Sequence, residues 1–258
     1  MNPIGNLFRT SIGRKFLMAV TGAVLILFVT AHLVGNLQIF EAPDRINGYS
    51  YFLQSLGPTL WLERAGLLLC AVIHIWAATV LTLENWRARG GATAPEKTWI
   101  QATVASRYMR WTGYVVLAFI LYHLAQFTLG VAQPETFKAH LRIYTMQGDY
   151  RVFGFIAVRS GTEVLDVYNM VILGFQNTIV ALFYILAVGL LSLHLLHGAD
   201  SMFQTLGWRN RRWAGGLRAI VTLACAAYFL GNLAIPGAVL SGALQPRPAL
   251  AAAVPDRP

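Results

Sequence analysis

Long apolar segments separated by polar stretches dominate the chain. Five of them approach the roughly 20 residues that an α-helix needs to cross a bilayer. They lie at about residues 16–39, 61–84, 110–132, 168–197 and 216–240. The 258 residues are 56% hydrophobic and only 12% charged, which is unlike an ordinary soluble domain. The sequence therefore predicts an all-α membrane protein, with five transmembrane helices in a single integral membrane domain over residues 1–258.

The polar connections add further expectations. Residues 41–58 hold turn-forming and aromatic residues suited to a membrane interface, and residues 133–166 are expected outside the membrane with a short hairpin. The tail, residues 242–258, is expected to be flexible. The first apolar run continues to Phe40, which is too long for the core of a cleavable signal peptide. We therefore expect it to be kept as the first helix.

Lysine and arginine collect on one side of the predicted helices, whereas the opposite side has acidic residues mixed in. The positive-inside rule then places the N-terminus in the cytoplasm and the C-terminus outside. We expect the membrane to be a bacterial cytoplasmic (inner) membrane. This orientation, with contact to lipid head groups or an acidic partner, explains the net charge of +9 better than nucleic acid does. The basic residues of the cytoplasmic side are Arg9, Arg14, Lys15, Arg87, Arg89, Lys97, Arg107, Arg110, Arg209, Arg211, Arg212 and Arg218.

Four histidines stand alone in the first four apolar segments: His32, His74, His123 and His194. An ionisable side chain in a lipid-spanning helix is costly, and it usually faces the interior of the bundle or a ligand. At 1.5 Å per residue from the outer helix ends, His32 and His123 lie about 13 and 10 Å deep. By the same count His74 lies about 24 Å deep. His194, counted from Tyr168, lies about 40 Å deep, which implies a tilted helix or one that begins above the membrane.

The depths indicate an outer pair, His32 with His123, and an inner pair, His74 with His194. Two imidazoles that reach inward from facing helices are what a six-coordinate haem requires. The sequence therefore predicts two haem b cofactors, one in each pair, held by a bundle of four of the five helices.

A repeated spacing supports the two levels. In the first and third segments a threonine lies eleven residues before the histidine and is followed by glycine, as Thr21-Gly22 and Thr112-Gly113. Eleven residues make about three helical turns, so each Thr-Gly element faces the same way roughly 16 Å deeper, near the inner histidines. There, Gly22 and Gly113 would let a flat macrocycle approach the backbone. The alternative is that small residues simply help membrane helices to pack.

Other interpretations of the histidines stay open. They could be buried residues that are hydrogen-bonded to neighbouring helices. Zinc or copper fits less well, because the four do not share one level and no cysteine or carboxylate joins them. His197, three residues after His194, could replace it as ligand, bind a haem propionate or lie at the cytoplasmic interface. His140, in the outer loop, is expected to be solvated.

The residues around these histidines resemble a known family. The runs SIGRKFLMAVTG and AHLVGN, RWTG and YHLAQ, and HLLHG and LGW look like the five-helix (type B) di-haem cytochrome b subunit of succinate dehydrogenase or fumarate reductase. The resemblance covers about residues 10–240. It implies a membrane anchor for a flavoprotein and an iron–sulfur protein on the cytoplasmic side. It also implies electron transport between the iron–sulfur subunit and a quinone, in a respiratory complex II of the tricarboxylic acid cycle.

The resemblance also bears on the site. The family's ligand in the fourth helix is followed by glycine at four and thirteen residues, as Gly198 and Gly207 follow His194, so His194 is preferred over His197. The chain would then be the subunit that does not bind the dicarboxylate, contributing to a quinone site and belonging to a complex that could assemble into a higher oligomer. Whether the complex oxidises succinate or reduces fumarate is left open.

A quinone site needs a proton donor or acceptor beside the ring. An outer carboxylate such as Glu63 would fit menaquinone chemistry linked to the outer surface, although an acidic residue near a helix start also has a plain capping role. The candidates on the outer side are Glu63, Arg64 and Gln54, and those for quinone or propionates on the inner side are Ser11, Arg14, Arg110 and His197.

Two other functions remain as alternatives. One is a different di-haem cytochrome b that anchors a hydrogenase or a formate dehydrogenase, which the spacing of the motifs disfavours. The other is a haem-free membrane transporter or structural membrane protein whose histidines bind or relay ions.

Overall fold

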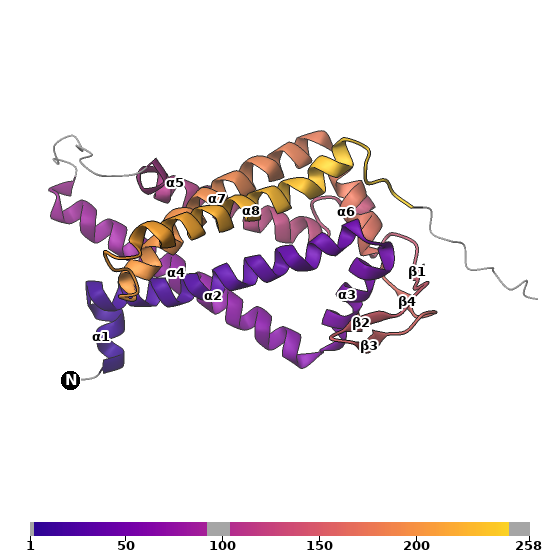
Figure 1. Ribbon diagram of the computed structural model, residues 1–258, viewed down its shortest axis with the longest axis horizontal. Helices are drawn as coiled ribbons and strands as arrows, with labels where there is room; N and C mark the ends of the chain where they lie inside the picture. The colour runs from indigo at the N-terminus through magenta and orange to yellow at the C-terminus, as the bar shows by residue number, and fades with distance from the viewer. Residues whose placement is uncertain (1–2, 92–103, 248–258) are drawn as a thin grey trace, which may run out of the picture. The chain divides into compact units, whose positions relative to one another are not determined.

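The computed structural model describes residues 3–91 and 104–247, and it is mostly helical (74%) (Figure 1). The described residues fall into two compact units. The first holds those of Met1–Ala31, Trp61–Gly113 and Leu191–Ala227, and the second holds those of His32–Leu60, Tyr114–Leu190 and Tyr228–Pro258. Lys97 and residues 248–258 of the predicted flexible tail lie outside the described residues.

Within the described residues, four helices are long and apolar enough to cross a membrane. At most 33% of the most apolar stretch of any of them is buried within the chain, and Leu27, Leu62 and Ile179 are 71%, 75% and 80% exposed. Apolar surface of this extent is left for lipid, as in a multi-pass membrane protein. The four are α2 (Ser11–Leu37) with the short helix η1 (Gln38–Phe40), α4 (Pro58–Ala88), α7 (Thr178–Thr205) and α8 (Ala214–Leu240).

The predicted span over 110–132 corresponds to the helix α5 (Val104–Phe127), which is not among those four. Its 24 residues include Arg110, His123 and Gln126, and these polar side chains lower its mean hydropathy. Its length would still cover a bilayer. The fifth crossing therefore stays a prediction.

The apolar segment over 168–197, predicted as one helix, is two: α6 (Val167–Gln176) and α7. Asn177 separates them with an extended backbone. Its side-chain oxygen accepts hydrogen bonds from the backbone N–H groups of Ile179 and Val180, at 3.1 and 3.3 Å, and so caps α7.

This break corrects the depth of His194. The count from Tyr168 includes α6 and the residue that ends it, neither of which belongs to the spanning helix. Counted from Thr178, the start of α7, His194 lies about 24 Å along its helix. His74 lies the same distance from Pro58, the start of α4.

The second unit also carries the strands. Tyr150–Val152 (β2) and Phe155–Val158 (β3) form an antiparallel hairpin, which confirms the hairpin predicted within 133–166. Its turn, Phe153-Gly154, has positive φ at both residues (49° and 87°), as a type I′ turn requires. The short strands β1 (Tyr144–Thr145) and β4 (Glu163–Val164) pair in the same way after the turn η3 (Pro134–Thr136).

Residues 41–58, expected as a turn-rich interface segment, contain the helix α3 (Pro43–Ser55), which lies beside β2 and β3 (Figure 1). Gly48 of α3 packs directly on Tyr150, where a Cβ would lie 2.6 Å from the Cβ of the tyrosine. Asn47, fully buried, accepts a hydrogen bond from the backbone N–H of Tyr168 at 2.8 Å. Asn169 exchanges two hydrogen bonds with the backbone of Arg247, which holds the described part of the tail on α6.

Candidate functional site

The outer pair of histidines meets inside the second unit. The ring centres of His32 and His123 lie 5.8 Å apart, with the ring planes 87° to each other. Two metal–nitrogen bonds of about 2 Å, plus about 1 Å from each nitrogen to its ring centre, give about 6 Å for two imidazoles on one iron. The spacing of this pair therefore fits axial ligation of a haem.

The tautomer of His123 follows from its neighbours. Tyr184 donates its hydroxyl proton to Oε1 of Gln126 at 2.7 Å, so its oxygen accepts from Nδ1 of His123 at 3.4 Å. Nε2 of His123 then carries no proton and is the atom available to a metal. The rings of Phe119 and Phe127 lie 5.9 and 5.6 Å from the His123 ring and keep water away from it.

The inner histidine on α4, His74, is held in the same tautomer. Its Nδ1 lies 3.1 Å from the backbone oxygen of Met18 and 3.3 Å from Oγ1 of Thr21. The carbonyl can only accept, and Thr21 already donates its proton to the Leu17 oxygen at 2.7 Å. His74 must therefore donate from Nδ1, which leaves Nε2 for a metal, the usual arrangement behind a metal-binding histidine.

His194 on α7 repeats this arrangement against α5. Its Nδ1 lies 3.2 Å from Oγ1 of Thr112, which donates to the backbone oxygen of Met109 at 3.0 Å. His194 therefore donates from Nδ1 to the Thr112 hydroxyl. The sequence motif is the same in both helices, Met-x-x-Thr-Gly. His194 and His74 are close enough to interact electrostatically. The inner pair is therefore brought together within the first unit.

The glycine of each motif lies against the inner histidine that its threonine holds. A Cβ added to Gly22 would lie 3.2 Å from Cε1 of His74, and one added to Gly113 would lie 3.6 Å from Cε1 of His194. Both glycines are therefore at the level that the eleven-residue spacing predicts. Their role beside a macrocycle stays a prediction.

The donor set fits haem better than a bare metal ion. Over residues 3–91 and 104–247, no three or more His, Cys, Asp or Glu side chains gather in a way that could hold a metal ion. Imidazoles in pairs, with the Nδ1 proton of three of the four already placed, fit what histidine-ligated haems would need. That these histidines bind haem iron stays a prediction.

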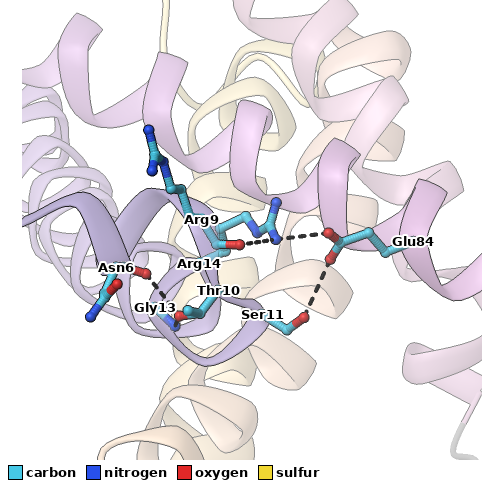
Figure 2. A network of polar contacts seen from close by, with 7 residues as sticks. All are labelled: Asn6, Arg9, Thr10, Ser11, Gly13, Arg14 and Glu84. Atoms are coloured by element: carbon cyan, nitrogen blue, oxygen red, sulfur yellow. Dashed lines mark hydrogen bonds and ion pairs between the residues drawn. The ribbon is translucent and has the colours of Figure 1, made fainter. Parts of the chain in front are cut away.

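A polar cluster joins α1 (Pro3–Arg9) and the start of α2 to α4 (Figure 2). Arg14, 9% exposed, forms an ion pair with Glu84 at 2.7 Å and donates to the backbone oxygen of Arg9 at 2.8 Å. Ser11 donates to the second oxygen of Glu84 at 3.4 Å. Nε of Arg14 is buried and has no hydrogen-bond partner in the described part of the chain.

The corner between α1 and α2 sets the geometry of this cluster. Thr10 donates to the backbone oxygen of Asn6 at 2.8 Å and accepts from the backbone N–H of Gly13 at 3.0 Å. A Cβ on Gly13 would come within 2.5 Å of the α1 backbone, so only glycine fits there. The corner therefore fixes where Ser11 and Arg14 meet Glu84 (Figure 2).

The other quinone and propionate candidates are less enclosed. Glu63 and Arg110 are exposed, and the guanidinium of Arg64 lies 5.0 Å from the ring centre of Trp61. Gln54 donates to Ser50 at 3.0 Å within α3. Of the remaining histidines, His197 lies 3.2 Å from the hydroxyl of Ser201 through Nε2, and His140 lies 2.6 Å from the backbone oxygen of Pro134 through Nδ1.

Glu84, Tyr184 and Gln126 are among the residues of these sites that were not singled out from the sequence. A lone carboxylate at the end of an apolar run, with an arginine at the start of another, is a signal that could have found Glu84. Tyr184 and Gln126 gave no such signal, because a tyrosine and a glutamine in apolar helices are common packing residues.

Comparison of the chain with models of protein families, with curated proteins and with solved structures finds no match.

Proposed function

We propose that the chain is the membrane-anchor cytochrome b of a succinate dehydrogenase or fumarate reductase, with one haem b held by His32 and His123 and a second by His74 and His194. It would pass electrons between an iron–sulfur subunit and a quinone. The observation that carries the proposal is that the rings of His32 and His123 lie 5.8 Å apart. His74 and His194 form a second pair, near enough to each other to interact electrostatically. The repeated Met-x-x-Thr-Gly elements behind the inner pair add to it.

The protein's own groups orient the proposed ligands. The Met18 carbonyl and the Thr21 hydroxyl would take the Nδ1 proton of His74 and so leave Nε2 without a proton. The Thr112 hydroxyl on α5 would do the same for His194. A haem held by two histidines would have no open position on its iron, which would suit electron transfer rather than oxygen chemistry.

For the quinone, which we propose to be menaquinone, the Ser11–Arg14–Glu84 cluster has more support than Glu63, because its guanidinium is buried. A buried guanidinium can hold a quinone oxygen, and a carboxylate beside it can exchange a proton with the ring. Glu63, exposed on α4, is the outer candidate. Glu84→Gln should slow quinone turnover with both haem spectra intact, whereas equal turnover in Glu84→Gln and wild type would remove the inner cluster from the proposal. Glu63→Gln tests the outer candidate in the same way.

The haem proposal is tested by alanine variants of the two pairs. His74→Ala or His194→Ala should remove the inner haem and leave the outer one, and His32→Ala or His123→Ala should do the reverse. Reduced-minus-oxidised spectra of the purified chain measure both. Loss of both haems in equal measure, or of neither, contradicts the pairing. A colourless wild type indicates the haem-free transporter, and co-purification with a hydrogenase or formate dehydrogenase indicates the other anchor.

A further inference from the structure

The outer and inner histidines differ in what lies behind them. His74 donates to the Met18 carbonyl, and His194 donates to the Thr112 hydroxyl; each acceptor lies on a neighbouring helix. Behind His123 there is instead a chain of side chains. Tyr184 accepts from His123 and donates to Gln126, and Gln126 donates through Nε2 to Oε1 of Gln133.

The hydrogen-bonded side chains of Tyr184 and Gln126 are buried and tightly packed. Tyr184 is 6% exposed and Gln126 is 2% exposed. The Tyr184 ring packs edge-on against Phe175 and Phe119, at 4.9 and 5.1 Å between ring centres. Gly174 leaves room for the amide of Gln126, because a Cβ there would lie 3.0 Å from its Nε2. With the ring and the amide fixed, the tyrosine proton points to Gln126 and its oxygen is left to accept from His123.

We propose that Tyr184 is a positioning residue for His123, which fixes the tautomer of this ligand and lowers the redox potential of the outer haem independently of the inner one. The inference rests on the proposed function. A histidine that donates from Nδ1 is a more basic ligand through Nε2, and a more basic ligand favours the oxidised iron. Gln126 strengthens the effect, because a hydroxyl that donates its own proton becomes a better acceptor.

The experiment is a redox titration of the Tyr184→Phe chain, purified with its partners, followed by optical spectra. The component missing from His123→Ala identifies the outer haem. In Tyr184→Phe the midpoint potential of the outer haem should rise by up to about 59 mV. For one electron this corresponds to a tenfold change in the equilibrium constant between reduced and oxidised haem. The inner component should not move. Gln126→Leu should shift the outer component in the same direction by a smaller amount.

Tyr122→Phe is the matched control. Tyr122 packs beside Tyr184, with 6.2 Å between the ring centres, but no contact links its hydroxyl to His123 in the described part of the chain. It should leave both potentials unchanged. Two haems with an unmoved outer potential in Tyr184→Phe would overturn the inference while the proposed function stands. Loss of the outer haem alone would support positioning, and loss of both haems would count against it. A wild type without haem would instead overturn the proposed function.

Discussion

Removal of one charge from the Arg14–Glu84 pair should cost more than removal of both. The side chain of Arg14 is 11% exposed and that of Glu84 is 39% exposed. In Glu84→Gln the guanidinium stays buried with its charge uncompensated. Breaking a fully buried pair in this way costs about 3–5 kcal/mol. Because solvent reaches Glu84 and screens its charge, we expect about 2 kcal/mol here.

The double variant Arg14→Met/Glu84→Gln removes the buried cation as well and keeps an apolar side chain of similar length. An ion pair replaced by apolar groups of similar volume is often neutral, so the double variant should recover at least half of the loss. Thermal unfolding of the detergent-solubilised chain measures this, because about 2 kcal/mol corresponds to a fall in Tm of about 4–8 °C in a protein of this size.

Arg14→Met alone completes the cycle and is expected to cost about 1 kcal/mol, since Glu84 can then be hydrated. A double variant that unfolds at or below the Tm of Glu84→Gln would refute the reasoning, because the buried cation would then not be the source of the loss. If Glu84→Gln and Arg14→Met lose equal stability, the difference in burial between Arg14 and Glu84 does not determine the cost of breaking the pair.

Three further outcomes follow from close contacts and caps. Gly22→Ala should lower inner-haem occupancy, measured by absorbance per chain, more than Gly113→Ala, because its Cβ lies closer to the histidine (3.2 against 3.6 Å); equal losses contradict this. Gly48→Ala should destabilise by about 1–3 kcal/mol through overpacking, so an unchanged Tm argues against the packing of α3 on β2. Asn177→Ala should cost about 1 kcal/mol through loss of the α7 cap, whereas Asn177→Asp should keep most of the stability, and equal Tm values for the two variants oppose that role.

The approach of His32 to His123 could be predicted because helical rise converts sequence position into depth. The same count misplaced His194, because it included α6. The Thr-Gly spacing worked, since eleven residues return a side chain to the same face three turns away. The hairpin within 133–166 was also accessible, because its turn residues and alternating strands are local signals. These features depend on one helix or one hairpin at a time.

The break at Asn177 could not be predicted from periodicity. The segments on both sides are apolar, and the polar run Gln176-Asn177-Thr178 contains neither glycine nor proline. A capping asparagine in such a short run is indistinguishable from a polar residue inside a helix. The hydrogen-bonded side chains behind His123 could not be predicted from the sequence either. It joins Tyr184, Gln126 and Gln133, which come from two helices and a loop, and only packing decides that they meet.

The measurement that tests the central claim most directly is a redox titration of the purified wild-type chain, followed through its reduced-minus-oxidised spectrum. Four histidines arranged as two pairs predict two b-type haem components per chain, of which His74→Ala removes one and His32→Ala removes the other. A colourless protein, or one whose single component survives both substitutions, would contradict the claim.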